Sequence, residues 1–218
     1  MALPSDAGGV GPLIEGVYGP FRITERDQRE VLAYRLSLLA AALAQAALLL
    51  QWQLLGGAAV WPWLLALAAG IGLALHWIHI YLRPLHRALQ LFWLLGCLGL
   101  GLLAWRVGPA AMAPTLAADG RWIWAVGPLG AALAGIGFKE FFCFRRPEAI
   151  GVTLLLPLAL LGQLSGLLPP PLVGRLLALE AALLLVLSLR KFPMAAAADV
   201  GDKSVFAFLE EQRRATTA

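Results

Sequence analysis

Three histidines, His76, His79 and His86, stand within eleven residues of the sequence, together with Arg83 and Arg87. Imidazole is a common ligand of haem iron and of transition metals, and arginine pairs well with carboxylates such as haem propionates. Because His76 and His79 are three residues apart, they share a face if this segment is helical. The grouping predicts a site for a tetrapyrrole (haem or chlorophyll) or a metal. The alternative is a set of histidines at a polar–apolar boundary that binds nothing.

A second group of polar residues stands inside long apolar stretches. Glu180 is near the middle of the last such stretch, where a carboxylate costs ~2.5–3.5 kcal/mol on insertion scales. Arg175 is five residues away, a poor spacing for one helix face. Gln163 and Gln45 stand in two other apolar stretches at comparable depth. The group predicts either a proton or ion pathway or a polar clasp between the fifth and sixth apolar segments.

A third group lies in the stretch FKEFFCFRR, where Lys139, Glu140, Arg145 and Arg146 alternate with aromatic residues. Long basic side chains and aromatic rings favour the boundary between lipid and water. The pattern therefore predicts an interfacial anchor or a docking surface for a partner.

The elements that must position these groups follow from composition and from the length of the apolar stretches. The chain is 60% hydrophobic and 14% charged, whereas soluble domains carry about 25% charged residues. Each apolar stretch is close to the ~20 residues that a helix needs to cross a bilayer. The predicted fold is therefore all-α, a polytopic transmembrane bundle of six spans, near 36–55, 59–82, 85–105, 122–144, 150–168 and 172–189.

The regions outside the spans are short. Residues 1–35 are predicted as a cytoplasmic arm, loose over 1–23, followed by the interfacial start of the first helix behind Thr24 as N-cap. Residues 36–189 form the transmembrane domain, with a loop over 107–120. Residues 190–218 form a cytoplasmic tail, in which Asp202 is expected to cap a short amphipathic helix with an apolar side formed by Val205, Phe206, Phe208 and Leu209.

The orientation follows from the basic residues. With both termini inside, all of the 17 Lys and Arg residues except Arg106, Arg121 and Arg175 fall on the inner side. Most tryptophans then lie at the outer ends of the spans, where an amphipathic ring is favoured. Because the basic residues flank apolar stretches and form no patch on a polar domain, nucleic-acid binding is excluded. Small residues at four-residue or similar spacing, including Gly70 in the second span and Gly96, Gly99 and Gly101 in the third, predict close helix contacts.

Nothing in the sequence indicates catalysis. It contains no HExxH or CxxC motif, no glycine-rich phosphate loop and no nucleophile–base pair. The two cysteines, Cys97 and Cys143, fall at different depths, so no disulfide is expected between them. The outer loops are also too short to hold an active site, which argues against an enzyme.

Three segments carry a resemblance to a known family: GIGFKEFFCFRRPEA at 135–149, TLLLPLALLGQLSG at 153–166, and LRKFPM…ADVGDKSVFAFLEE over 189–211. They resemble an uncharacterised family of integral membrane proteins of cyanobacteria and chloroplasts. The resemblance implies a photosynthetic host and a thylakoid or plasma membrane, with no activity to carry over. An auxiliary role near pigment–protein complexes is then expected.

Two functions from different classes remain open. The first is a non-enzymatic auxiliary, scaffold or assembly factor that acts through other membrane proteins in the bilayer and binds a tetrapyrrole near the inner interface. The second is a small transporter or channel that uses Glu180.

Overall fold

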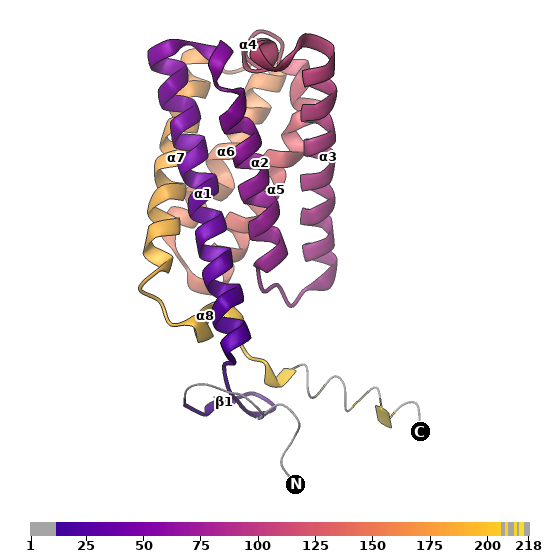
Figure 1. Ribbon diagram of the computed structural model, residues 1–218, viewed down its shortest axis with the longest axis vertical. Coiled ribbons are helices and arrows are strands. Elements are labelled where there is room, and N and C mark those ends of the chain that lie inside the picture. The colour runs from indigo at the N-terminus through magenta and orange to yellow at the C-terminus, as the bar shows by residue number, and fades with distance from the viewer. Residues whose placement is uncertain (1–11, 206–207, 209–211, 213, 216–218) are drawn as a thin grey trace.

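Six long helices run side by side in the computed structural model, which describes residues 12–205, 208, 212, 214 and 215 (Figure 1). A two-stranded antiparallel hairpin, β1 (Ile14–Gly16) and β2 (Gly19–Phe21), precedes them. The long helices are α1 (Glu25–Leu55), α2 (Trp61–Trp77), α3 (Arg83–Val107), α5 (Ile123–Phe144), α6 (Pro147–Ser165) and α7 (Pro170–Lys191).

The two ends of the bundle differ. One end, here called the α4 end, carries the short elements η2 (Gly57–Ala59), η3 (Pro109–Ala111), α4 (Met112–Ala118) and η4 (Gly120–Trp122). The opposite end, here called the terminal end, carries the β-hairpin and α8 (Ala196–Val200), as Figure 1 shows.

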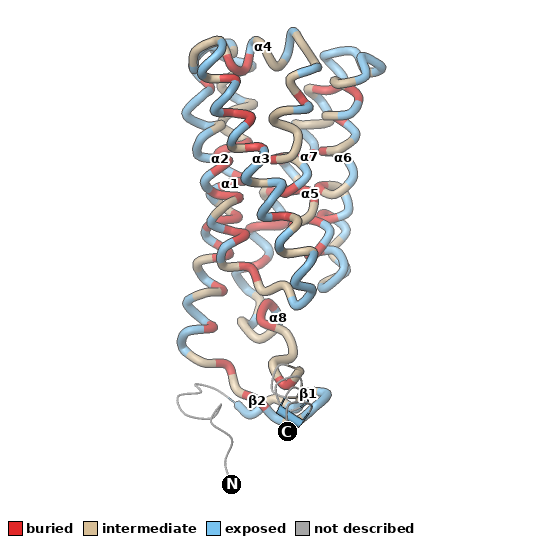
Figure 2. The backbone as a smooth tube through the Cα atoms, turned by 90° about the vertical axis from the view of Figure 1, so that its right-hand side faces the viewer, coloured by how far each residue is buried: buried red, intermediate tan, exposed pale blue. Residues whose placement is uncertain are grey.

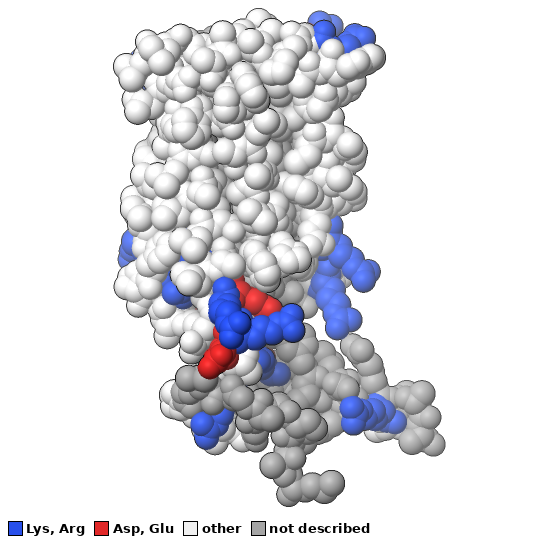
Figure 3. All heavy atoms as spheres, viewed as in Figure 1, with Lys and Arg blue, Asp and Glu red and all other residues white. Residues whose placement is uncertain are grey.

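The length and composition of the helices suit a bilayer. Five of the long helices are long and apolar enough to cross a membrane, and α2 is an apolar helix of 17 residues. On the face shown in Figure 3, Lys and Arg gather toward the terminal end and at one corner of the α4 end, with an uncharged surface between them. This band of uncharged surface is what a hydrocarbon environment requires.

The six long helices form a closed ring in which each contacts the next: α1, α2, α3, α5, α6, α7 and again α1. Their inward faces carry the buried residues, as Figure 2 shows. One apolar cluster joins all six, with Leu38, Leu75, Leu103, Leu133 and Leu184 among its members. Large apolar side chains also cover the outward faces, where lipid replaces water as the solvent.

Glycines bring neighbouring helices together at two of these contacts. A Cβ atom at Gly70 of α2 would lie 2.8 Å from the Ala41 nitrogen of α1, and one at Gly99 of α3 would clash with the Ala125 carbonyl oxygen of α5. Both positions, and Gly96 against Leu129, confirm the predicted close contacts. Gly101 faces open space, so that part of the prediction is wrong.

The predicted start of the first helix is confirmed, but the segment before it is better ordered than expected. Thr24 accepts a hydrogen bond from the Asp27 amide, and the Asp27 carboxylate accepts one from the Thr24 amide, which is a capping box. Residues predicted as loose form the hairpin. The Val17 amide donates to Asp202 and the Tyr18 amide donates to Ser204, so the hairpin is tied to the C-terminal segment.

Three other boundaries differ from the sequence-based prediction. α2 ends at Trp77, and residues 78–82, predicted as helix, link it to α3. The expected loop over 107–120 contains α4, which closes one end of the ring. In the tail, α8 was not predicted. Asp202 does accept from the Ser204 amide at 2.9 Å, as a cap should. Phe206 and Leu209 were expected on the apolar side of the amphipathic helix predicted after Asp202, and they lie outside the described residues.

Candidate functional site

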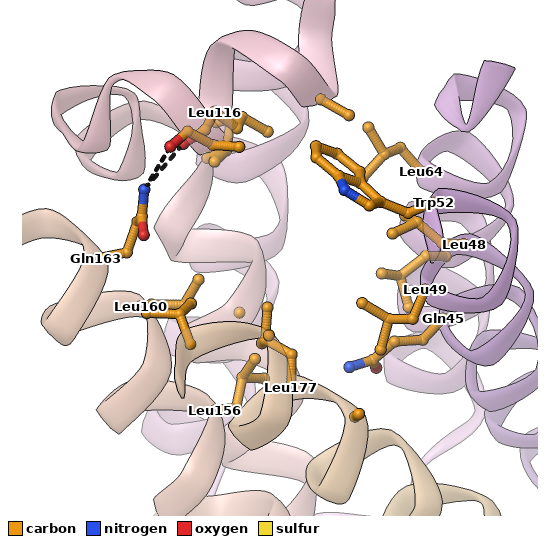
Figure 4. A pocket seen from close by; sticks show the side chains of 18 of the residues that line it. Gln45, Leu48, Leu49, Trp52, Leu64, Leu116, Leu156, Leu160, Gln163 and Leu177 are labelled. Carbon is orange, nitrogen blue, oxygen red and sulfur yellow. Dashed lines mark hydrogen bonds between the residues drawn. The ribbon is translucent and has the colours of Figure 1, made fainter. Parts of the chain in front are cut away.

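A cavity of about 700 Å³ lies inside the ring, in the half of the bundle next to α4 (Figure 4). Residues from α4 and all six long helices line it, and most of them are apolar. This cavity is called the chamber below. The apolar lining residues labelled in Figure 4 include Leu48, Trp52, Leu64, Leu116, Leu156, Leu160 and Leu177.

The chamber reaches the surface between the ends of α1 and α7. Gln53 of α1 and Pro171, Arg175 and Ala178 of α7 line it and are themselves exposed. The volume is within the ~300–1,000 Å³ of small-molecule sites, which are mostly apolar with a few placed polar groups. The opening therefore gives a small molecule access to an apolar interior.

Few polar side chains line the chamber. Gln163 of α6 donates to the backbone oxygens of Ala117 at 2.9 Å and Leu116 at 3.5 Å, which attaches α4 to α6 (Figure 4). Gln45 of α1 lies at the other end of the chamber, about three turns from the α4 end of its helix. Of the lining glutamines, Gln45 is the buried one.

Gln45 makes its hydrogen bond with Glu180 of α7, through Nε2 as donor and Oε2 as acceptor. Glu180 is completely buried, and none of the ion pairs among the described residues includes it. The other oxygens of the two side chains, Gln45 Oε1 and Glu180 Oε1, are also buried and have no hydrogen-bond partner in the described part of the chain. The pair is thus only partly satisfied, which is rare for buried polar groups.

The predicted polar group is therefore brought together only in part. Gln45 and Glu180 meet, which links α1 with α7, whereas the expected clasp between α6 and α7 is wrong. Gln163 contacts α4 instead. Arg175 is exposed at the opening and forms no described ion pair with Glu180.

A second buried polar group lies at the terminal end. Lys191 at the end of α7 donates to Glu140 Oε2 and to Asp199 Oδ1, both at 2.5 Å. Arg35 of α1 donates to Asp199 Oδ2 from Nε at 2.8 Å and from Nη2 at 2.6 Å. This group is called the ion cluster below, and its charged members are Arg35, Lys139, Glu140, Lys191 and Asp199.

Aromatic rings complete the ion cluster. The Tyr34 hydroxyl donates to Glu140 Oε1 at 2.7 Å, and Lys139 donates to the same oxygen at 3.2 Å. The Lys191 ammonium lies 4.4 Å from the centre of the Phe144 ring and 5.3 Å from that of Tyr34. These distances are within the range of cation–π attraction. The cluster thereby fixes α1, α5, α7 and α8 to one another.

Asp199 shows the electrostatic balance of the cluster. Burial by itself would raise the pKa of its carboxyl, but the charges of Lys191 and Lys139 and the hydrogen bond from Arg35 hold that pKa below its ordinary value. Asp199 is therefore a carboxylate at neutral pH. In the sequence, Arg35 and Lys191 resemble the basic residues that flank any span, and the one signal for Asp199 is a lone charge after four alanines.

The predicted docking surface is wrong for two of its residues. Lys139 and Glu140 are 6% and 1% exposed and belong to the ion cluster, so no partner reaches them. Arg146 is half-buried, and its Nη1 lies 3.9 Å from Glu148. Arg145 is exposed at the end of α5.

The histidines do not converge. Because α2 ends at Trp77, the prediction that His76 and His79 share a helix face is wrong. His79 Nε2 lies 3.3 Å from Glu30, and His86 Nε2 lies 2.7 Å from the Leu75 carbonyl oxygen. His76 is exposed with its ring edge-on to Trp77, and Arg83 and Arg87 are exposed at the start of α3.

His79 instead joins a different group. Among the described residues, its ring nitrogen comes within 4.8 Å of carboxylate oxygens of Asp27 and Glu30. Asp27, however, already accepts hydrogen bonds from Lys203 at 2.8 Å and from Thr24. The carboxylate is thus committed to fixing the C-terminal segment to the start of α1.

Comparison with known proteins gives a family. The family model described as "Uncharacterized integral membrane protein (DUF2301)" matches residues 73–208. This range contains α3 to α8 and therefore Glu180 and most of the ion cluster. No curated protein and no solved structure was found to match the chain.

Proposed function

The chain belongs to this family of uncharacterised integral membrane proteins, and we propose that it binds an apolar or amphipathic small molecule in the chamber without catalysing a reaction. The observation that carries the proposal is the chamber of about 700 Å³, enclosed by the six long helices. A well-packed bundle contains few voids larger than a water molecule. A cavity of this size with access from the surface is the default location of a ligand site.

The lining indicates what kind of molecule binds. Leucines from α4 and all six long helices, together with the Trp52 side chain, offer dispersion contacts but few hydrogen bonds. A strongly polar solute would lose its hydration there without replacement. A molecule with a mainly hydrocarbon body has little hydration to lose. Such molecules are already dissolved in the bilayer next to the opening.

For the membrane topology, we propose six spans with both ends on the cytoplasmic side. The helix α2 is 17 residues long, at the lower limit of what spans a bilayer. It runs alongside the other five in the closed ring. Six spans bring both termini to the same side, and the Lys and Arg counts favour the inside. Labelling of the exposed Cys143 by a membrane-impermeant maleimide added outside intact cells would contradict this orientation.

A second function, an auxiliary or assembly factor that acts through membrane partners, has one observation in its favour. Phe138, Phe141 and Phe142 are exposed at the terminal end of α5, and the rings of Phe138 and Phe142 stack with centres 6.1 Å apart. Photo-crosslinking from Cys143 in native membranes tests it, and crosslinks to lipid alone would oppose it.

The tetrapyrrole hypothesis now involves His76 alone, as the exposed histidine. It requires a Soret or chlorophyll absorption band of the purified protein that a His76→Ala variant loses. A thylakoid location, expected from the resemblance, remains part of the same proposal.

The proposed ligand site is tested by filling the chamber. A Cβ atom at Gly174, which lines the chamber, would meet no atom within 4 Å, so Gly174→Trp can place a large ring there. Gly101→Trp is the matched control, because Gly101 also faces open space but lies on the exposed side of α3. We expect mass spectrometry to find small apolar molecules retained by the wild type and by Gly101→Trp, and lost from Gly174→Trp. Equal retention by all three proteins would contradict the proposal.

A further inference from the structure

Two buried oxygen atoms beside the chamber have no hydrogen-bond donor. They are Gln45 Oε1 and Glu180 Oε1, and both side chains are more than nine-tenths buried. Gln45 lines the chamber and directs its amide inward from α1 (Figure 4). Glu180 is not itself a lining residue, but it accepts the hydrogen bond from the Gln45 amide and so lies next to the lining. Each unsatisfied buried acceptor costs ~1–3 kcal/mol. A donor supplied by a molecule in the chamber would remove that cost.

The ion cluster does not show this lack of partners, so the lack is a property of the Gln45–Glu180 pair and not of every buried polar group in the bundle. There each carboxylate faces at least one cation, with Lys191 between Glu140 and Asp199. The remaining buried oxygen without a hydrogen-bond donor among the described residues, Glu148 Oε1, lies 3.0 Å from the Arg190 guanidinium. No basic side chain of the described residues forms an ion pair with Glu180. The nearest basic residue along α7 is Arg175, which is exposed at the opening.

The chemistry of the two free atoms restricts the ligand. An amide oxygen and the oxygen of an ionised carboxylate both accept hydrogen bonds, so with Glu180 ionised they repel a ligand carboxylate or phosphate and attract N–H or O–H groups. A charged donor forms hydrogen bonds about twice as strong as a neutral one. It also supplies the cation that a buried carboxylate otherwise lacks.

We propose that the Gln45–Glu180 pair is the polar anchor of the chamber and that it selects amphipathic amines, whose ammonium N–H groups bond to the two free oxygens. The hydrocarbon body of the amine lies along the leucines toward α4. This inference rests on the proposed function, because it names the ligand class of the same chamber.

The test is a series of ten-carbon amphiphiles that differ only in the head group. Binding of radiolabelled decylamine, decanol, decyltrimethylammonium and decanoate is measured on the full chain in lipid nanodiscs, with empty nanodiscs as background. We expect decylamine to bind about tenfold more tightly than decanol, because of its charged donor. Decyltrimethylammonium, a cation without N–H groups, and decanoate should bind more weakly than decanol.

Three variants assign the selectivity to the anchor. Glu180→Gln and Gln45→Leu should each reduce the preference for decylamine over decanol to less than about threefold, since the charged or the neutral acceptor is lost. Gln28→Leu is the matched control, because Gln28 is an exposed glutamine of α1 outside the chamber lining, and it should behave as wild type. The head-group order on the wild type needs no variant to fold.

The outcomes separate the anchor from the chamber. If decylamine and decanol bind alike, or if Glu180→Gln leaves the preference unchanged, the anchor is overturned while the chamber remains a ligand site. If no member of the series binds above empty nanodiscs, and Gly174→Trp also retains the same molecules as wild type, both the anchor and the proposed function are overturned.

Discussion

The two buried polar groups of this bundle follow different rules. The ion cluster at the terminal end joins three cations to two carboxylates, with a tyrosine hydroxyl and two aromatic rings around them. Within the part of the chain that the structure describes, the Gln45–Glu180 pair has one hydrogen bond, no cation and two oxygens without donors. Both are buried, and burial makes charge costly. We attribute the first group to the stability of the fold, and the second is the anchor that we propose for a ligand of the chamber.

The largest expected effect is on the ion cluster. Lys191→Met removes the ammonium that separates Glu140 from Asp199 and leaves two buried carboxylates facing each other. Breaking a buried ion pair in this way costs ~3–5 kcal/mol. Thermal unfolding in detergent should therefore show a large loss of stability.

Arg121→Met is the control for Lys191→Met. Arg121 also forms an ion pair, with Asp119 at 2.9 Å, but its side chain is 87% exposed, so its loss should leave the unfolding temperature nearly unchanged. Similar losses in the two variants would mean that the ion cluster is not a structural centre.

A medium effect is expected at the Gln45–Glu180 pair, and here the double variant is the sharper test. Gln45→Leu alone leaves Glu180 without its hydrogen bond and should cost ~1–3 kcal/mol of unfolding free energy. Gln45→Leu with Glu180→Leu removes both partners and should be as stable as wild type or more so. A double variant less stable than Gln45→Leu would show that the pair serves the fold, as the ion cluster does.

The smallest effect is a pH dependence that belongs to Asp199. Its pKa lies below the ordinary value of 3.8, so the folded state binds this proton less readily than the unfolded state. The stability that Asp199 contributes is thus fully present above pH ~4. It is lost as the pH falls from there through the lowered pKa.

The measurement is the shift in unfolding temperature between pH 7 and pH 3 for wild type and for Asp199→Asn. The variant carries no carboxyl at this position, so it should lose less stability on acidification than wild type does. Equal losses in the two proteins would mean that Asp199 does not contribute to the acid sensitivity.

The long helices could be located from the sequence because each one follows from the apolar residues of its own segment. Residues 122–144 and 172–189 are apolar over the length of a span, and the helices α5 and α7 follow within a few residues. The sequence-based prediction failed where the cause is not local. Residues 78–82 are apolar enough for a helix but form the connection to α3, and residues predicted as a loose arm pair as a hairpin against Asp202 and Ser204.

The candidate site was found in part for the same reason. A carboxylate in the middle of an apolar stretch is visible in any sequence, so Glu180 was singled out correctly as a buried polar residue. The sequence offered Gln45, Gln163 and Arg175 as partners of Glu180 and gave no means of choosing among them. Lys139 was predicted to lie at the interface because aromatic and basic residues surround it in the sequence. The helix rotation that buries it depends on α1 and α7.

The sequence by itself determined that this is a bundle of membrane helices, because a chain in lipid must satisfy its backbone hydrogen bonds within each segment. Only the tertiary structure decided which polar side chains meet. Gln45 and Glu180 are 135 residues apart, and Arg35 and Asp199 are 164 apart. Such pairs depend on how the helices close into a ring and on how each is rotated about its axis. The same closure leaves the chamber, a volume that belongs to no single segment.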